Sequence, residues 1–529
     1  MGVLNAVNTL IGEGRSFWSS GKQISWAITL TCELAFILFG IEQGVMGNLI
    51  DGDEFLDTFN HPTGSFLGII VSIYTLGCFF GCILNFFVGD ILGRRLNIML
   101  AMVMILIGVA LQTSAFGVPQ LMIGRFLSGV GTGLETSTVP MYQSENCHKS
   151  MRGRLVCSEA LFVGIGLVYA YWVTYGLSFV SGDLKWRLPI ATQMIFAIIV
   201  FALCITVCES PRYLYKIGKK DVCRKNLAYV FGKPANDPEI VSLYNEIEQS
   251  MLIEDLEGGN WSQIFKRDAV RTRQRMILSY MSMFAQQLSG INLINYYITT
   301  VLIQNVGLDR NLAMILGGCC VICFTIGSLV PSFYSDKLGR RLPSAFGHAC
   351  CGLCMMMVTI LLSFQDDPSK SKSTGAASVA FFFLFQLVFG ATANCIPWVI
   401  VPELLPLSQR SRGTALGVSA NWLWNFFVVE ITPTIISNIT YRSYIIFTVT
   451  NLAFAVMFYL FYPEVKGLTL ESVDTLFMDH GRVMMGFVDT SVYVCGGGDE
   501  ENALNFSSKP SVQHVVSVSE EEKTQDETP

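Results

Sequence analysis

Twelve stretches of about 20 or more mostly apolar residues constrain this chain more than any other feature, because each is long enough to cross a lipid bilayer as a helix. Of the 529 residues, 51% are hydrophobic and only 14% are charged, whereas soluble domains are about 25% charged. The sequence therefore predicts a polytopic membrane protein. The predicted spans lie near residues 25–47, 65–88, 96–116, 119–143, 154–177, 188–207, 274–303, 311–335, 342–364, 376–404, 411–436 and 442–462.

Lys and Arg collect in alternate connecting segments, such as those with Arg94 and Arg340. Loops rich in basic residues stay in the cytoplasm, so both chain ends are expected there. The first segment of the opposite set is acidic, from Asp51 to Asp57. Asn438, which begins a glycosylation sequon, then falls in a short external loop.

Charge and composition also divide the chain into segments. We expect a cytoplasmic lead at 1–24, a six-helix bundle at 25–207, a cytoplasmic helical linker at 208–273, a second bundle at 274–462 and a cytoplasmic tail at 463–529. Asp237-Pro238-Glu239 predicts a helix start within the linker. The tail after about residue 478, with its glycine run and acidic end, is predicted to be disordered.

The two halves repeat one another. The pattern Asp-x-x-Gly-Arg-Arg begins at Asp90 after the second span and at Asp336 after the eighth. Matching acids also follow the fourth and tenth spans and end the sixth and twelfth. Parallel duplication of a six-helix unit is typical of one large transporter class, which binds its substrate at mid-membrane between the halves.

Three amides, Gln286, Gln287 and Asn292, interrupt the seventh span. Neutral amides in hydrocarbon must face a partner helix or a wet cavity, and each both donates and accepts hydrogen bonds. Such a cluster suits a ligand covered with hydroxyl groups. The alternative is that the amides only join one membrane helix to another.

Other function classes find little support in the sequence. The formal net charge of −6 argues against nucleic acid as a partner, and the 16 cysteines show no metal-binding spacing. We find no nucleotide-binding loop and no catalytic constellation, so we expect no enzyme activity and no cofactor.

The motifs together resemble the sugar porter family of the major facilitator superfamily over about residues 25–477. They include the doubled Asp-x-x-Gly-Arg-Arg, Gly124-Arg125, Glu209-Ser210-Pro211-Arg212, the Gln286 stretch, Pro397-Trp398, Asn421-Trp422 and Pro463-Glu464. The sequence from Phe39 to Gly44 in the first span looks most like that of fungal members, including yeast glycerol/proton symporters. The resemblance implies an all-α membrane protein with twelve transmembrane helices in two pseudo-symmetric bundles.

The resemblance also implies site residues. The substrate would be bound by Gln286, Gln287, Asn292, Trp398, Asn421, Trp422 and Asn425, with the amides on sugar hydroxyls and the aromatic faces on the sugar ring. Several polar positions of hexose carriers are replaced here, by Ala160, Phe324 and Gly390. A smaller polyol, a pentose or an unusual sugar is therefore as plausible a substrate as glucose.

Proton-coupled members pair an acid of the first span with an arginine of the fourth, which correspond to Glu42 and Arg125. The family usually has Asp at the first position, and a static ion pair is the alternative reading. Four further acids have no family role that we can assign, namely Glu33, Glu135, Glu159 and Glu430.

The family closes its cytoplasmic side with charge networks, and Tyr296 and Tyr297 resemble its extracellular gate. The cytoplasmic gate would comprise Asp90, Arg94, Arg95, Glu145, Arg152, Glu209, Asp336, Arg340, Arg341, Glu403, Arg410 and Glu464. Exposed ion pairs contribute only about 0–1 kcal/mol each, so such a network biases a conformational equilibrium without locking it.

The sequence thus predicts a monomeric plasma-membrane importer of a monosaccharide or polyol, with proton symport by alternating access. A facilitative carrier, an exporter of a pathway metabolite and a sugar sensor that transports nothing remain as alternatives.

Overall fold

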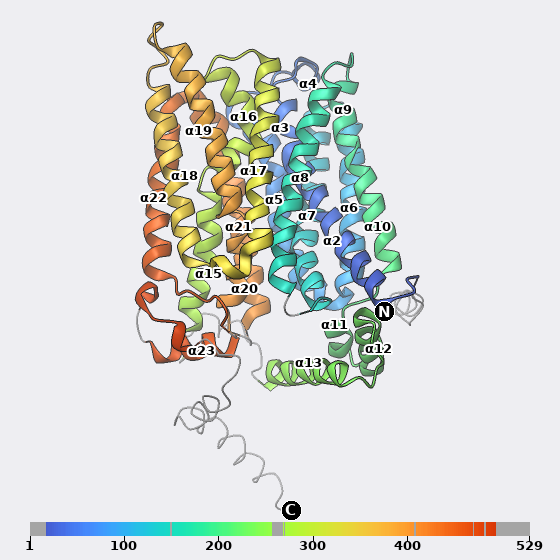
Figure 1. The fold of residues 1–529 in the computed structure, drawn as a ribbon. Helices are drawn as coiled ribbons and strands as arrows, with labels where there is room; N and C mark the ends of the chain where they lie inside the picture. Colours follow the sequence, from blue (N-terminus) through green and yellow to red (C-terminus); the bar gives the residue numbers. More distant parts are fainter. Residues whose placement is uncertain are drawn as a thin grey trace, which may run out of the picture.

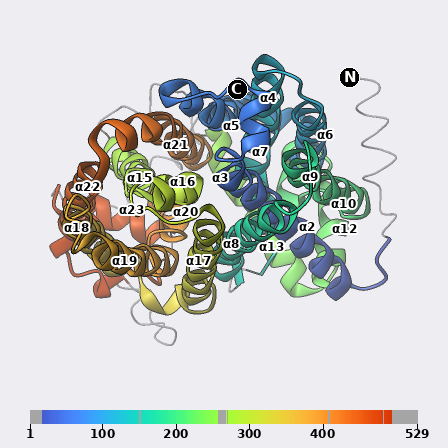
Figure 2. The same cartoon turned by 90° about the horizontal axis from the view of Figure 1, so that it is seen from above.

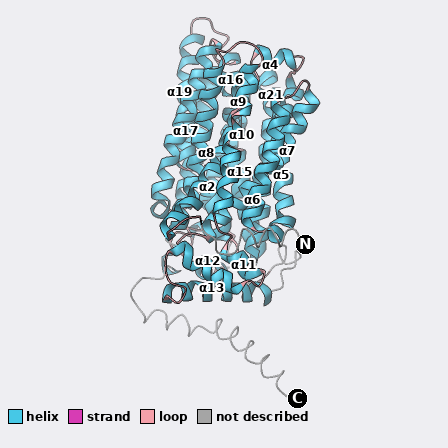
Figure 3. Cartoon of the chain, turned by 90° about the vertical axis from the view of Figure 1, so that its right-hand side faces the viewer, coloured by secondary structure: helices cyan, strands magenta, loops and turns pink. Residues whose placement is uncertain are grey.

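The computed structural model describes residues 17–148, 151–256, 268, 270–406, 409–468, 470–480 and 483–493. These residues form helices and connecting loops, and Figure 3 shows no strand among them. Two helical bundles stand side by side (Figures 1 and 2). Large apolar side chains such as Trp26, Phe116 and Phe333 are exposed on them, as expected of a surface that faces lipid.

The N-terminal bundle contains six membrane crossings, with a short helix α4 (Asp53–Thr58) outside it. The crossings are α2 (Gly21–Gly44) continued by α3 (Met46–Leu49), α5 (Gly64–Leu92), α6 (Arg94–Thr113), α7 (Val118–Glu145), α8 (Arg152–Leu177), and α9 (Leu184–Ala191) continued by α10 (Gln193–Thr206).

The C-terminal bundle repeats this arrangement. Its crossings are α15 (Thr272–Gln287) with α16 (Ile291–Gln304), α17 (Arg310–Leu338), α18 (Arg341–Leu362), α19 (Ser371–Ala391) with α20 (Ile396–Leu404), α21 (Arg410–Ile439), and α22 (Ser443–Phe461) after the turn η3 (Thr440–Arg442). The predicted twelve crossings in two bundles are confirmed.

Hydropathy alone identifies fewer crossings. Among the described residues, nine stretches are long and apolar enough to span a membrane, and one of them contains both α21 and α22. The two crossings missed are α7, which carries Arg125 and Glu135, and the pair α15–α16, which is broken into two shorter helices. Both exceptions contain the polar residues on which the functional predictions depend.

Small residues let the helices of the N-terminal bundle pack backbone to backbone. A Cβ atom on Gly40 would lie 2.1 Å from the carbonyl oxygen of Val163, and one on Gly166 would lie 2.2 Å from that of Ile37. Close approach of this kind is a common way for helices to associate in membranes. It holds α2 firmly against α8.

Two long helix pairs join the halves, α8 with α17 and α5 with α21. Viewed from above, α8 and α17 lie together where the bundles meet (Figure 2). The interface between the halves is therefore bounded by these two pairs, and polar residues on their inner faces are candidates for a site.

Short helices cover the cytoplasmic side. The helices α11 (Pro211–Lys216), α12 (Lys220–Phe231) and α13 (Pro238–Leu256) lie below the N-terminal bundle (Figure 1) and share an apolar core. The predicted helix start is confirmed, since α13 begins at Pro238 and the Asp237 carboxylate accepts from the Glu239 N–H at 3.0 Å.

The C-terminal tail contains more structure than expected. Helix α23 (Leu470–Asp479) is followed by the 3₁₀ turns η4 (Met485–Phe487) and η5 (Ser491–Tyr493). The predicted start of disorder near residue 478 is wrong as far as Tyr493, because the Met485 and Tyr493 side chains are buried against α22 and α23. Residues 494–529 lie outside the described part.

Candidate functional site

A break in the seventh crossing places the predicted amides. Gly290 has φ of 96°, a conformation that favours glycine, and it ends the gap between α15 and α16. The carbonyl groups freed in the gap are satisfied by α22. Thr450 donates to the Leu288 carbonyl at 2.9 Å, and Asn451 donates to the Ser289 carbonyl at 2.7 Å. The break is therefore a supported feature of the fold.

The predicted amides form one hydrogen-bonded cluster. Gln287 donates to the Asn421 side-chain oxygen and accepts from Asn292 at 2.7 Å. Gln286 donates to the backbone carbonyls of Ala393 and Asn394, at 3.1 and 2.6 Å. All four amide side chains are buried. The structure thus brings together side chains from α15, α16 and α21.

Aromatic side chains from both halves lie next to this cluster. Trp422 is fully buried and contacts Phe39 and Tyr74 of the other half edge-on, with ring centroids 5.4 and 6.4 Å apart. The Trp422 ring N–H and the Asn425 side-chain oxygen have no hydrogen-bond partner. Unpaired buried polar groups are costly, so these two are ready to bind a hydroxylated ligand. Trp398 is partly buried beside apolar Met283 and Val401.

Contacts within the C-terminal half and between the halves close the predicted extracellular side. Tyr296 and Tyr297 are buried, and the Tyr297 hydroxyl donates to the Val429 carbonyl at 3.0 Å. Further out, Thr299 donates to Asn48 and Thr300 to Asp51, both at 2.6 Å. These last two bonds, which join α16 to the segment around α3, were not predicted.

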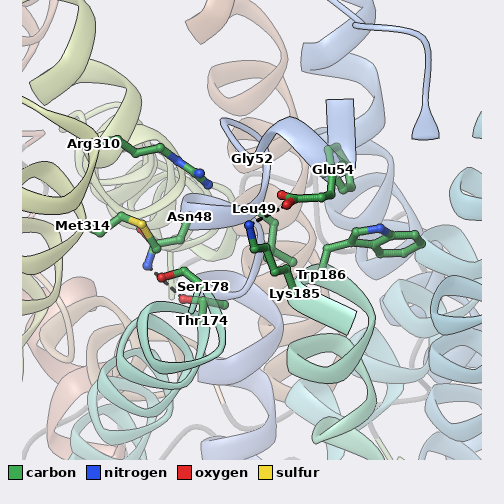
Figure 4. A pocket seen from close by; sticks show the side chains of 11 residues that line it. Asn48, Leu49, Gly52, Glu54, Thr174, Ser178, Lys185, Trp186, Arg310 and Met314 are labelled. Carbon is green, nitrogen blue, oxygen red and sulfur yellow. Dashed lines mark hydrogen bonds and ion pairs between the residues drawn. The ribbon is translucent and has the colours of Figure 1, made fainter. Parts of the chain in front are cut away.

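An open pocket lies above these contacts (Figure 4). Its lining comes from both halves and includes Asn48, Glu54, Lys185 and Arg310. Lys185 donates to Glu54 at 2.5 Å and lowers the pKa of that carboxyl, whereas burial raises the pKa of nearby Asp51. Arg310 of α17 also acts on the charge of Asp51, so charges of the two halves meet beside the pocket.

The predicted proton pair is close but not in contact. Glu42 and Arg125 are fully buried and within electrostatic reach of each other, yet no ion pair within 4 Å joins them. Arg125 donates to the Val71 carbonyl at 3.0 Å and lies over the Tyr74 ring. Both Glu42 carboxylate oxygens lack a hydrogen-bond partner. Glu42 and Arg125 therefore do not form the static ion pair that was the alternative reading of the sequence.

The cytoplasmic clusters repeat in the two halves. Arg94 contacts Glu145 at 3.2 Å, as Arg340 contacts Glu403 at 3.0 Å. Glu209 accepts from the backbone N–H groups of Arg94 and Arg95, and Glu464 accepts from those of Arg340 and Arg341. Each cluster ties together the ends of helices within its own half.

Two predicted gate residues, Arg341 and Arg410, donate to backbone carbonyls. The Arg341 side chain donates to the Tyr459 carbonyl, at 2.7 and 3.0 Å, and does not contact an acid. Arg410 donates to the Leu405 carbonyl at 3.4 Å. The side chains of Asp90, Arg152 and Asp336 lie outside the described part. Asn438 is exposed in the last turn of α21 and not in the loop predicted from the sequence, because the helix continues to Ile439.

Two buried polar residues near the cluster, Gln386 and Asn451, were missed. Gln386 donates to the Asn295 side-chain oxygen at 2.7 Å. Partly buried Asn394 donates to the Ser328 hydroxyl at 3.2 Å and toward the Ala160 carbonyl at 3.4 Å. Gln386 and Asn451 are lone amides in apolar spans. Their isolation was the available signal, because an amide in hydrocarbon needs a polar partner.

The comparisons with known proteins agree with this architecture. Residues 28–477 match the family model described as "Sugar (and other) transporter". The MFS-type transporter oryC of Aspergillus oryzae is 35% identical over 89% of this chain and 88% of its own length. Sugar transporter STL1 of Saccharomyces cerevisiae is 32% identical over 87% and 83%. The proton:xylose symporter XylE, 23% identical, superposes with a TM-score of 0.75 over 86% of this chain and 100% of that chain.

Proposed function

Because this chain belongs to the sugar (and other) transporter family, we propose that it imports a monosaccharide or small polyol together with protons, by alternating access. The observation that carries the proposal is the Gln287 side chain, which links Asn292 and Asn421 between α15, α16 and α21. A polyhydroxylated ligand can replace these amide–amide bonds one for one, since amides and hydroxyls both donate and accept.

The neighbouring apolar positions favour a small substrate. Phe324 stacks on Phe389 with ring centroids 6.3 Å apart, and a Cβ atom on Gly390 would lie 2.3 Å from the Phe324 carbonyl oxygen. The side chains of Phe324 and Phe389 supply packing surface here and no hydrogen bonds. A ligand with hydroxyl groups directed toward the Gln287 cluster fits such a one-sided site.

Glu42 supports proton coupling. A fully buried carboxylate without a hydrogen-bond donor is costly in its ionised form, so Glu42 would carry a proton in this closed state. Arg125, held by Val71 and Tyr74, stabilises the ionised form once water reaches the site. The carboxyl can therefore bind a proton on one side of the membrane and release it on the other.

Alternating access follows from the contacts at both ends. The Asn48–Thr299 and Asp51–Thr300 bonds must break for the outer side to open. The Arg94–Glu145 and Arg340–Glu403 clusters bias the inner side toward its closed form. The named relatives include a sugar transporter and a proton:xylose symporter, which is in line with this assignment.

The test is uptake into proteoliposomes across a panel of hexoses, pentoses and polyols, with and without an inward proton gradient. We expect accumulation of at least one panel member, abolished by a protonophore. Uptake that equilibrates but never accumulates would identify a facilitative carrier, and no uptake of any panel member would contradict the proposal.

A further inference from the structure

Glu33 and Glu159 are two buried acids of the N-terminal bundle that lie within electrostatic reach of one another. Glu33 belongs to α2 and Glu159 to α8, the two helices held together by Gly40 and Gly166. At about 1.5 Å per residue, Glu33 lies roughly 18 Å from the start of α2, and Glu159 roughly 10 Å from the start of α8. Both lie on the cytoplasmic side of Glu42.

Few hydrogen bonds stabilise the ionised forms of the two acids. Their side chains are 5% and 2% exposed. The Ser158 hydroxyl donates to one Glu33 oxygen at 2.5 Å, while the other Glu33 oxygen and one Glu159 oxygen have no partner. Each carboxyl lies within electrostatic reach of the other.

Within the part of the chain that the structure describes, the groups that act directly on the pair carry no positive charge. Those that act on it or on adjacent Cys32 are the thiols of Cys147 after α7, Cys157 in α8 and Cys204 in α10. From α17 and α20, Ser332 and Cys395 contact Cys157. Among the described residues no lysine, arginine or histidine forms an ion pair with either acid.

Two buried carboxylates without a cation cannot both remain ionised. We propose that Glu33 and Glu159 form a second proton-binding site, which holds one proton in the closed state and releases it to cytoplasmic water when the inner side opens. The proton leaves a carboxyl oxygen for water, and the remaining negative charge is then solvated. The site deepens the proposed symport and rests on it for its role in transport.

The position of Glu159 connects the site to the substrate. Its neighbour Ala160 lies close to Asn394, whose backbone carbonyl accepts a hydrogen bond from Gln286. A rearrangement of the substrate amides is therefore transmitted to α8 within one residue of Glu159. Proton release and substrate release would thus be coupled through the start of α20.

Infrared difference titration of the purified full-length protein tests the site without a substrate. We expect a protonated-carboxyl band at neutral pH that loses one carboxyl's intensity in Glu159→Gln or Glu33→Gln. Ser158→Ala should shift the band and keep its intensity. Glu430→Gln, the same change at an acid outside the pair, should leave the band unchanged. An unaltered band in both Glu33→Gln and Glu159→Gln would overturn the proposal.

A transport experiment distinguishes the role of this site from that of Glu42. With glycerol and D-xylose as probes in proteoliposomes, Glu159→Gln should keep exchange within about twofold and lose at least tenfold in accumulation driven by a proton gradient. Full accumulation in Glu159→Gln would overturn the role in transport. If the wild type accumulates neither probe while the infrared band responds as expected, the proton site stands and the proposed symport of these probes fails.

Discussion

The Asn451 side-chain amide donates a 2.7 Å hydrogen bond to the carbonyl oxygen of Ser289, inside the gap between α15 and α16. Removing it leaves a buried carbonyl unpaired, which costs about 1–3 kcal/mol. We expect Asn451→Ala to weaken apparent substrate affinity roughly tenfold or more, because the break that places Gln286 and Gln287 loses its support. Equilibrium exchange in proteoliposomes measures the effect.

Thr448→Val is the matched control on the same helix. The Thr448 hydroxyl donates only to the Tyr444 carbonyl one turn earlier, so its loss should leave affinity within about twofold. Equal losses in Asn451→Ala and Thr448→Val would show that α22 does not position the site.

The Gln287 side chain tests the substrate assignment itself. Gln287→Leu leaves Asn292 and Asn421 without their shared partner and removes one group that could bind a hydroxyl. We expect a loss of about 10- to 100-fold in apparent affinity, equivalent to 1–3 kcal/mol. Ser419→Ala, in α21 but bonded only to its own helix, should bind normally. Unchanged affinity in Gln287→Leu would place the substrate elsewhere.

Two buried thiols join the halves below the site, since the Cys157 and Cys395 sulfur atoms lie 2.9 Å apart. Diamide should oxidise them to a disulfide, with the two protons and two electrons reducing its N=N bond to a hydrazine. Because α8 and α20 belong to different halves, the bond should abolish transport until dithiothreitol is added.

Cys395→Ser should resist this inhibition, whereas Cys320→Ser, in a buried thiol outside the pair, should not. Mass spectrometry identifies the bond. A protein that is fully cross-linked between these two cysteines and still transports at the wild-type rate would contradict the movement of the halves at this level.

The inner side should close as the pH falls. Burial raises the pKa of Glu209, against the opposing N–H of Ser210 and the charges of Arg94 and Arg95. If opening exposes Glu209, its pKa returns toward the ordinary value of about 4.3. The closed state then binds the proton more tightly, so acid favours closure over the range from about 4.3 up to the raised pKa, and closure is lost above it.

Glu209→Gln should mimic the protonated form and remove this dependence. Energy transfer between dyes on unnatural amino acids at the cytoplasmic ends of α8 and α20 would report closure. Opening that increases as the pH falls would contradict the sign, and an unchanged pH dependence in Glu209→Gln would assign it to another group.

The sequence predicted the fold because its signals are local and repeated. Apolar length, alternate basic loops and the doubled Asp-x-x-Gly-Arg-Arg each constrain the topology independently. The same logic found Gln286, Gln287 and Asn292, since several amides close together in one span need polar partners, whereas Asn421 came from the family resemblance. It also paired Arg94 with Glu145 and Arg340 with Glu403 through their matched positions.

Contacts between spans that are distant along the chain give weaker signals in the sequence. Single residues such as Gln386, Asn451 and Asn48 look like ordinary polar exceptions until the packing shows their partners. The sequence could not give the side-chain direction of Arg341, which contacts the Tyr459 carbonyl. It likewise could not show that Arg125 bonds Val71 and leaves Glu42 unpaired.

The most direct measurement records substrate uptake and proton entry together in the same proteoliposomes, with a pH-sensitive dye inside. The account predicts that the two signals rise in a constant ratio in the wild type, and that Glu42→Gln exchanges substrate without proton entry. Substrate accumulation by Glu42→Gln, or wild-type uptake with no proton signal, would contradict it.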